Sequence, residues 1–356
     1  MLLLVGQLGY EDVMKVNFFS KEPFEQLLYE QYTSIDIRIL RDLYGDVKVS
    51  NSIFNLSFNA DIYFSWWATG SIVPLVVGLL RNKPVVVVVG GNEALLTRDS
   101  INGEYFGYGS FGFIKKAIVD FVLRYSDRLV AVSEFSREEL QKVTSSDVSM
   151  IYNAVDLDDF DEKVFADSQH ECRFITVCRL DDKPVRIKRL ENILKAFAVL
   201  KLSCPEAILS IVGERGSAYP ALLDIVERLS LANNVRFLGK VPNANMSALL
   251  KCHDCYVQLS DVETFGVAVV EAAATLLPLI LSRRGALVEV SNEYAVFVDH
   301  NEIRDIASAF SKFCNGEYPF VLSKRLDLRR FVHENFSYNA RALKIENLIN
   351  GVLESG

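Results

Sequence analysis

Short apolar runs rich in valine and isoleucine alternate with segments whose apolar residues recur every three or four positions. Runs of the first kind indicate buried strands, and segments of the second kind indicate helices that cover a sheet. Strands that alternate with helices are typical of parallel sheets, because each parallel connection has to cross over the sheet. The pattern therefore predicts an α/β protein built on parallel sheets.

In the first half of the chain this pattern predicts one sheet. Strands are expected near residues 2–5, 35–40, 61–64, 84–89 and 128–132, and helices near residues 24–31, 71–80, 111–125 and 136–143. Isoleucines recur at every second position in 35–40, which is the period of a strand. The unbroken valines at 85–89 indicate a central strand that is covered on both faces.

The second half shows the alternation more clearly. Strands are expected near residues 174–178, 207–212, 235–238, 255–259 and 279–282, and helices near residues 190–200, 220–231, 245–251, 265–275 and 303–313. We therefore expect two Rossmann-like domains, at residues 1–160 and 171–335, that face each other across a cleft. The linker is expected at about 154–170. A last helical segment within 336–356 could dock onto either domain, and a return toward the first domain is one option.

Composition supports two domains and excludes some partners. The chain has 356 residues, which is more than one core normally holds. Its net charge is −8 without a concentrated basic face, so we expect no nucleic-acid partner. No apolar run reaches the roughly 20 residues that span a bilayer, and no basic residues precede the apolar start of the chain. A soluble, cytoplasmic protein is expected.

The six cysteines are few and irregularly spaced, so reduced thiols are expected rather than a disulfide framework. Cys252 and Cys255 have the spacing of half a zinc site, but no second pair of cysteines or histidines follows nearby in the sequence. We expect these two cysteines to be buried small residues, and we expect no bound metal.

The richest candidate loop follows the strand at 255–259. It contains Glu263, Thr264 and Gly266 and opens the next helix. Thr264 is a suitable N-cap, and Gly266 allows a ligand to approach the backbone. Because the first N–H groups of a helix have no partner within it, this start predicts an anion site that suits a diphosphate.

Glu271 lies inside this otherwise apolar helix. A carboxylate among valines and alanines has to be solvated, paired or hydrogen-bonded. Two interpretations remain open from the pattern alone. Glu271 is either a surface residue of the helix or a bidentate acceptor for paired hydroxyls such as those of a ribose.

Two basic residues are expected at the same edge of the sheet. Arg179 follows the strand at 174–178, and Lys188 opens the next helix. Two cations beside a helix start could hold a pyrophosphate and stabilise it as a leaving group. The alternative is that Arg179 pairs with Asp181 or Asp182 while Lys188 is solvated.

Together these segments resemble the donor half of family 4 retaining glycosyltransferases, which have the GT-B fold. The most specific element is the pair Glu263 and Glu271, eight positions apart, with Phe265-Gly266 between them. The similarity extends over about residues 128–340, whereas the first 125 residues resemble the family only in their strand and helix rhythm. Further matching positions are Val132-Ser133-Glu134, Asn153-Ala154-Val155-Asp156, Arg179, Lys188-Arg189-Leu190, Val212-Gly213-Glu214, Val235 to Gly239, Asp254 and Pro278.

The resemblance implies a role for each matching residue. Arg179 and Lys188 would hold the donor diphosphate, and Glu271 would bind the ribose hydroxyls. Glu263 and the backbone of Thr264, Phe265 and Gly266 would contact the transferred sugar. Gly213 would lie beside the donor, and Lys240 and Val241 would line the base pocket.

Two departures from the family pattern bear on the mechanism, and one further motif is discounted. The phosphate loop is long, so Arg186 is a rival for the role of Lys188. The family often carries a histidine after the strand at 84–89, where this chain has Gly90 and Gly91 followed by Asn92 and Glu93. The backbone of Gly91 and the side chain of Asn92 or Glu93 are therefore expected to contact the sugar. Asp156-Leu157-Asp158 spells a metal-binding D-x-D motif, but it falls in the linker and we discount it.

The resemblance implies a retaining glycosyltransferase that moves a hexose-type sugar from a UDP- or GDP-sugar to a hydroxyl of a lipid-linked glycan, a polysaccharide or a small molecule. No tightly bound cofactor is expected. Two alternatives are a sugar-nucleotide epimerase of the same fold and a non-catalytic protein that binds sugar nucleotides or glycans.

Membrane contact through the first domain is a weaker option. The helix at 111–125 has one apolar face with lysines beside it, and an aromatic cluster at 105–113 precedes it. Packing in the core is the ordinary meaning of such a face, and an interfacial helix at the inner side of a membrane is the alternative. Trp66 and Trp67 could stack on a sugar or a polyprenyl chain, or they could belong to the core.

Overall fold

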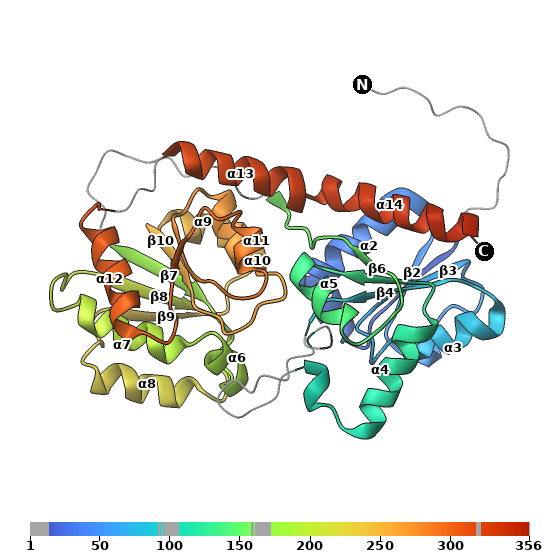
Figure 1. Ribbon diagram of the computed structural model, residues 1–356, viewed down its shortest axis with the longest axis horizontal. Coiled ribbons are helices and arrows are strands. Elements are labelled where there is room, and N and C mark those ends of the chain that lie inside the picture. The colour runs from blue at the N-terminus through green and yellow to red at the C-terminus, as the bar shows by residue number, and fades with distance from the viewer. Residues whose placement is uncertain are drawn as a thin grey trace.

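The computed structural model describes residues 14–91, 93, 95, 107–157, 160, 172–317 and 322–355. They form two parallel sheets of six strands, one from each half of the chain, and helices cover both faces of each sheet (Figure 1). The predicted fold class of two Rossmann-like parallel sheets is confirmed. No helix among these residues is long and apolar enough to cross a membrane.

The first sheet has the strand order β2-β1-β3-β4-β5-β6. Its strands are β1 (Val16–Phe19), β2 (Val47–Ser50), β3 (Ile62–Trp66), β4 (Val85–Val89), β5 (Arg128–Ala131) and β6 (Val148–Met150). Every residue of β4 is buried, because β4 lies between β3 and β5 and both of its faces are covered. The valine run therefore lies in the centre of the sheet, as the sequence predicts.

The helices of this half are α1 (Phe24–Tyr29), α2 (Gln31–Tyr44), α3 (Ile72–Arg81), α4 (Phe113–Tyr125) and α5 (Glu134–Gln141), with short 3₁₀ turns η1 (Ile53–Asn55) and η3 (Gly107–Ser110). Side chains alternate along β4: Val86 and Val88 pack with α2, and Val85, Val87 and Val89 pack toward α3 and α4. The two faces of the sheet therefore carry separate apolar layers.

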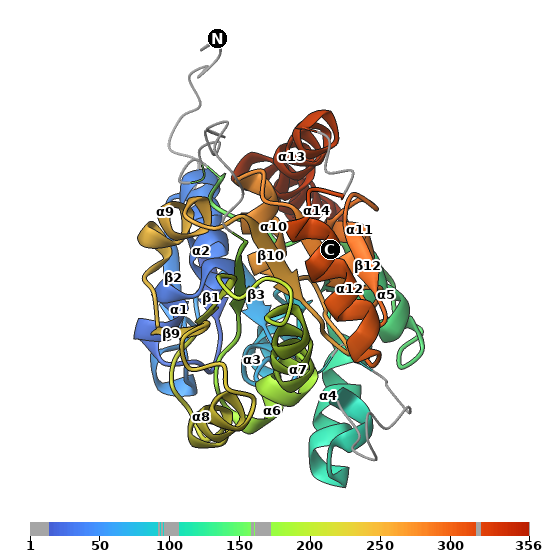
Figure 2. The same cartoon turned by 90° about the vertical axis from the view of Figure 1, so that its left-hand side faces the viewer.

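The second sheet has the order β12-β11-β10-β7-β8-β9. Its strands are β7 (Arg173–Val177), β8 (Ile208–Val212), β9 (Val235–Gly239), β10 (Cys255–Gln258), β11 (Leu279–Ser282) and β12 (Val296–Val298). Its helices are α6 (Asp182–Ile187), α7 (Leu190–Leu200), α8 (Tyr219–Arg228), α9 (Asn243–Lys251), α10 (Val267–Ala274), α11 (Leu287–Val290) and α12 (Ile303–Cys314). Helices α7 and α12 lie side by side over one face (Figures 1 and 2). Helices α9, α10 and α11 contribute to the apolar layer on the other face.

The last two helices connect the halves. Helix α13 (Leu322–Phe336) packs on α10, and α14 (Tyr338–Ser355) packs on α2 of the first half (Figure 1). The buried side chains of Arg341 and Asp36 meet in two hydrogen bonds of 2.5 and 2.8 Å. The C-terminal helix therefore covers the outer side of α2.

The strand predicted at 35–40 is wrong, because these residues form the middle of α2. Ile35 and Ile39 are one helical turn apart, and they are buried together with Ile37 and Leu40. The helix is buried on two sides, against the sheet and against α14, so its apolar residues are not confined to one stripe. The strand predicted at 2–5 lies outside the described residues. The sequence did not predict β1, β2, β6, β12, α6, α11 or α13.

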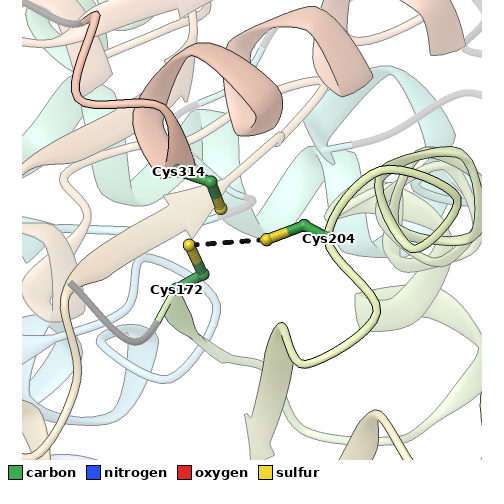
Figure 3. A group of neighbouring side chains, drawn as sticks. All are labelled: Cys172, Cys204 and Cys314. Carbon is green, nitrogen blue, oxygen red and sulfur yellow. Dashed lines mark hydrogen bonds between the residues drawn. The ribbon is translucent and has the colours of Figure 1, made fainter. Parts of the chain in front are cut away.

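The expectation that Cys252 and Cys255 are both buried is confirmed for Cys255 and wrong for Cys252. Cys252 is exposed at the end of α9, whereas Cys255 is fully buried in β10. Three others that lie far apart in the sequence, Cys172, Cys204 and Cys314, meet at one edge of the second half (Figure 3). Among the described residues no two cysteines form a disulfide.

Candidate active site

A cleft of about 900 Å³ lies between the two sheets. In parallel sheets, ligands bind beyond the carboxyl ends of the strands where the strand order reverses. These positions are between β1 and β3 in the first sheet and between β7 and β10 in the second. Loops that follow these strands line the cleft from both sides.

The cleft collects nearly all of the predicted site residues. Eleven of them line it: Gly91, Arg179, Lys188, Gly213, Lys240, Val241, Glu263, Thr264, Phe265, Gly266 and Glu271. The twelfth, Asn92, lies outside the described residues. The adjacent Glu93 is buried and accepts hydrogen bonds from the backbone N–H of Thr69 at 3.1 and 3.2 Å. Gly91 therefore brings backbone, rather than a charged side chain, to the cleft.

The two basic residues hold different positions. The Nζ of Lys188 donates to the carbonyl of Val177 at 3.1 Å, which places its ammonium at the carboxyl end of β7. Arg179 forms an ion pair of 2.7 Å with Asp181, and 62% of its side chain is exposed. The pairing considered as an alternative for Arg179 is thus present. The rival Arg186 is exposed on α6, whereas Lys188 lines the cleft.

The carboxylate of Glu271 is buried at the contact between the two halves. Its Oε1 accepts a hydrogen bond of 2.7 Å from Nε2 of Gln31, at the start of α2. The residue is only 5% exposed, so the surface interpretation is wrong. Burial raises the pKa of Glu271 to about 7, although the bond from Gln31 and the charge of Lys188 both lower it.

The loop before α10 contains Glu263, the second acidic residue of the predicted site. The Oε2 of Glu263 accepts a hydrogen bond of 2.8 Å from Gln258. Thr264 is not the N-cap of α10, because its Oγ1 donates to the carbonyl of Gly90 in the opposite half at 3.0 Å. The cap is Gly266, whose φ of +96° is unfavourable for any residue with a side chain. The first N–H groups of α10 therefore open toward the cleft without a side-chain cap.

Glycine at 213 is required by close packing. A Cβ at this position would lie 1.9 Å from the carbonyl oxygen of Cys178. Because Gly213 has no side chain, the loop after β8 can lie directly against the backbone that leads to Arg179. Gly213 therefore shapes the wall of the cleft beside the phosphate loop.

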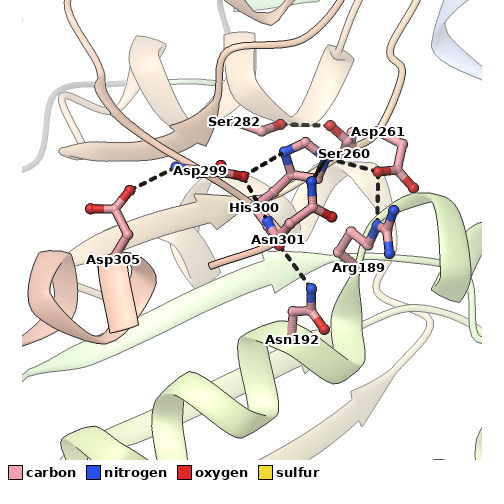
Figure 4. Close-up of polar contacts among 9 residues, drawn as sticks. All are labelled: Arg189, Asn192, Ser260, Asp261, Ser282, Asp299, His300, Asn301 and Asp305. Carbon is pink, nitrogen blue, oxygen red and sulfur yellow. Dashed lines mark hydrogen bonds and ion pairs between the residues drawn. The ribbon is translucent and has the colours of Figure 1, made fainter. Parts of the chain in front are cut away.

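A buried network braces the two loops (Figure 4). The Oδ1 of Asp261 lies 2.7 Å from Nε of Arg189 and 2.9 Å from Nε2 of His300. The backbone N–H of Asp261 also donates to the carbonyl of Ile187 at 2.8 Å. The loop after β7, which carries Lys188, is thereby fixed to the loop that carries Glu263. The sequence analysis missed this network, because partners so far apart in the chain leave no local pattern.

The first half forms the opposite wall with aromatic rings, glycine backbone and the acidic and amide side chains of residues 25–31. Trp66 is buried and donates from Nε1 to Asp36 at 2.8 Å, so it belongs to the core. Trp67 lines the cleft, and a Cβ on Gly91 would lie 2.6 Å from its ring. Tyr29 also lines the cleft, and its backbone carbonyl accepts a hydrogen bond of 3.0 Å from the side chain of Asn243.

Fold and site together define a class. The cleft lies between two facing parallel sheets. One of its walls carries a cation at a strand end and the start of a helix, which suits a ligand with a phosphate group. Residues 166–334 match the family model described as glycosyl transferases group 1, and residues 22–159 match the model of glycosyltransferase family 4. The chain belongs to the group 1 glycosyltransferases.

Curated relatives agree with this assignment. The phosphatidylinositol N-acetylglucosaminyltransferase GPI3 subunit of Saccharomyces cerevisiae is 26% identical over 322 residues, which cover 84% of this chain and 69% of the relative. The N-acetyl-alpha-D-glucosaminyl L-malate synthase of Bacillus anthracis is 28% identical over 182 residues, which cover 49% of this chain and 46% of the relative.

Solved structures share the whole architecture. The Anabaena protein Alr3699/HepE, solved in complex with UDP and glucose, superposes with a TM-score of 0.74 at 15% identity over 95% of this chain and 99% of its own. Sucrose-phosphate synthase from Thermosynechococcus elongatus gives 0.67 at 17% identity over 94% and 81%. The fold is therefore GT-B.

Proposed function

We propose that this glycosyltransferase is a retaining enzyme that transfers a hexose-type sugar from a nucleotide-diphosphate sugar to a hydroxyl acceptor. One observation carries the proposal. A buried carboxylate (Glu271), a cation (Lys188) and the uncapped start of α10 line the same wall of one cleft. These are the acceptor, the charge and the N–H donors that a ribose and a diphosphate require.

The donor would lie along the second half. Lys188 and the N–H groups at the start of α10 would hold the diphosphate, and Arg179 would join them by leaving Asp181. Glu271 would exchange its bond from Gln31 for bonds from the ribose hydroxyls. The base would lie near Lys240 and Val241, and Glu263 with the backbone of residues 264–266 would position the sugar.

The proposed transfer step balances without a separate side-chain base. The acceptor oxygen forms a bond to the anomeric carbon while the bond from that carbon to the diphosphate oxygen breaks. The acceptor proton passes to the departing phosphate oxygen on the same face, so the anomeric configuration is retained. Lys188 and the start of α10 stabilise the charge that develops on the diphosphate. The D-x-D residue Asp156 is paired with Arg38 at 2.7 Å and is not placed in this step.

We infer that the donor is a UDP-sugar. Structures of the Anabaena neighbour are described as complexes with UDP, with UDP and glucose, and with UDP-glucose. The relatives from S. cerevisiae and B. anthracis are named for N-acetylglucosaminyl products or transfer. UDP-glucose and UDP-N-acetylglucosamine are therefore the donors to test first, with GDP-sugars as the alternative.

The acceptor would bind in the first half, and we propose that it is carried by a membrane. Phe113 and Ile114 at the start of α4 are 86% and 75% exposed, and Lys115 and Lys116 follow them. Exposed apolar side chains beside cations suit an anionic lipid surface. The protein would then act peripherally at the cytoplasmic face. Cosedimentation with anionic vesicles should fall in a Phe113→Ser/Ile114→Ser variant and stay unchanged in Phe54→Ser, which is 98% exposed elsewhere.

The donor proposal is tested by thermal shift with UDP-, GDP- and ADP-sugars. A ligand at a hundred times its dissociation constant stabilises the folded protein by about 2.7 kcal/mol. We expect a UDP-sugar to raise the melting temperature and Glu271→Ala to abolish this shift. If no sugar nucleotide shifts the wild type, the proposal fails. Consumption of the donor without any acceptor would instead favour the epimerase alternative.

A further inference from the structure

Three cysteines from separate segments converge at the edge of the second sheet that is opposite the cleft (Figure 3). Cys172 precedes β7, Cys204 lies between α7 and β8, and Cys314 is the last residue of α12. Strands β7 and β8 both start at this edge of the sheet and end at the cleft. The five residues of β7 therefore separate the thiols from the catalytic wall by about 17 Å.

The three thiols have the spacing of a metal site. The Sγ atoms of Cys172 and Cys204 are 3.7 Å apart, and all three Sγ atoms lie within 4.8 Å of one another. Tetrahedral zinc with bonds of about 2.3 Å to sulfur places its ligands about 3.8 Å apart. A disulfide requires about 2.05 Å, so the observed spacing fits coordination better than a bond between sulfurs.

A fourth ligand is available beside the thiols. The carboxylate of the exposed Glu206 accepts a hydrogen bond of 3.0 Å from Sγ of Cys204. Cys172 and Cys204 are 4% and 8% exposed, and Cys314 is partly buried, so the site is sheltered but open on the side of Glu206. Cys172 also adopts a φ of +51°, a strained conformation of the kind that collects at ligand sites.

We propose that Cys172, Cys204 and Cys314 bind one Zn²⁺ ion, with Glu206 or a water as the fourth ligand. Soft thiolates select zinc over the harder Mg²⁺ and Ca²⁺. Binding releases the thiol protons to the solvent. The ion would tie the start of the second sheet to the end of α12 without touching the donor. Its role is therefore structural.

Cobalt substitution tests the site directly. The full chain, stripped of metal under reducing conditions, is titrated with Co²⁺, and the near-ultraviolet charge-transfer absorption from sulfur to cobalt is recorded. We expect one equivalent to bind and Zn²⁺ to displace it. Cys314→Ser should weaken binding at least tenfold, whereas Cys252→Ser, which alters the exposed cysteine outside the cluster, should bind normally. Absence of the absorption in the wild type, or equal binding by Cys314→Ser, would overturn the proposal.

A second measurement needs no variant. In the wild type, Zn²⁺ should protect three of the six thiols from a thiol reagent and raise the melting temperature. Removal of the metal should lower the melting temperature and leave sugar transfer at low temperature unchanged, because the site is distant from the cleft. Failure of zinc to protect any thiol would refute the site while leaving the proposed transferase function untouched. A disulfide between Cys172 and Cys204 in protein that takes up no metal would also refute it.

Discussion

The two walls of the cleft differ in the types of residue that line them. The wall of the second half presents charged groups, including Glu271 on α10 and Lys188 and Glu263 on loops that a buried network holds together. The wall of the first half presents aromatic rings and glycine backbone around Trp67 and Gly91, and acidic and amide side chains from residues 25–31, but no basic residue among the described residues that line it. The difference indicates that the second half supplies the positive charge that binds a phosphate, whereas the first half shapes the cleft. It also explains why motifs identify one wall and not the other.

The largest effect is expected outside the cleft, where the first half depends on the far end of the chain. Arg341 is buried on α14, and it donates to Asp36 and to the backbone carbonyl of Ile151 at 3.1 Å. Arg341→Ala would leave the carboxylate of Asp36 buried without its positively charged partner, with only the hydrogen bond from Trp66 remaining. Such losses cost about 3–5 kcal/mol of unfolding free energy. Urea denaturation measures this change.

A matched arginine on the surface is the control for this prediction. Arg330 on α13 is 69% exposed and pairs with Asp327 at 3.4 Å. Arg330→Ala should change the unfolding free energy by less than about 1 kcal/mol. Equal effects of the two variants would show that α14 does not support the first half.

The same helix pair shows where sequence-based prediction failed. The pattern at 35–40 fits a strand, because Ile35, Ile37 and Ile39 alternate with other residues. These residues nevertheless form a helix, and all three isoleucines are buried because α2 has tertiary contacts on two sides. Local periodicity cannot reveal that α14, about 300 positions later, covers the outer side. In the second half, α7 and α12 each bury one stripe and expose the opposite side, so both were identified correctly. Helix α10 is an exception, because it also packs on α13 and is buried from Val269 to Ala274.

The residues of the candidate site also divide into those that the sequence predicted and those that it missed. The cleft residues of the second half were predictable, because each follows a strand that the pattern identifies and the family motif fixes its position. The partner of Glu271 was not, because Gln31 comes from the other half and the alignment of two domains leaves no signal in either segment. Asp261 and His300 were missed because, although both lie in the second half, they are too far apart in the chain to leave a local pattern.

Within the cleft, the largest effect is expected at the cation of the charged wall. Lys188→Ala should lower kcat/KM by about 10²–10³, because one preorganised donor to a developing negative charge contributes about that factor. Lys195→Ala, on the next helix and paired with Glu191 at 2.7 Å, is the matched control and should retain full activity. Initial rates with a UDP-sugar give both values. A Lys188→Ala enzyme with normal rates would remove the basis for calling this wall electrostatic.

The pH dependence of donor binding tests the buried carboxylate of the same wall. Burial raises the pKa of Glu271 to about 7, so the group is protonated below that pH and loses acceptor capacity for ribose hydroxyls. Donor affinity should therefore fall as the pH drops through 7. Glu271→Gln should bind weakly at every pH. Isothermal titration with UDP between pH 5.5 and 8.5, a span chosen about that pKa, gives the profile.

Stability should respond in the opposite direction. The folded-state pKa of Glu271 lies above the ordinary glutamate value of 4.5, so between these two values the folded protein holds a proton that the unfolded chain releases. This contribution is present below about pH 4.5 and is lost as the pH rises to about 7. At pH 8, Glu271→Gln should therefore raise the unfolding free energy by up to about 3 kcal/mol. If Glu271→Gln is less stable than the wild type at pH 8, burial of the ionised carboxylate does not carry the cost assigned to it.

The shape of the opposite wall is tested by adding one methyl group. Gly91→Ala would place a Cβ 2.6 Å from the ring of Trp67, which is held by a hydrogen bond of 3.2 Å to Glu22. Overpacking of this kind costs about 1–3 kcal/mol, and the displaced ring should narrow the cleft. Gly112→Ala has open space around the new atom and is the control. Thermal melting and transfer rates should change in the first variant only.

The smallest effect is expected where the two walls touch. Gln31 donates to Glu271 at 2.7 Å, so the proposed ribose hydroxyls have to displace it. Because a hydrogen bond contributes about 1 kcal/mol net, Gln31→Ala should tighten UDP binding up to about fivefold. Gln26→Ala, a change of the same type on the same rim of the cleft, should leave the affinity unchanged. If Gln31→Ala weakens binding instead, Gln31 contacts the donor, and the first half then contributes polar recognition as well as shape.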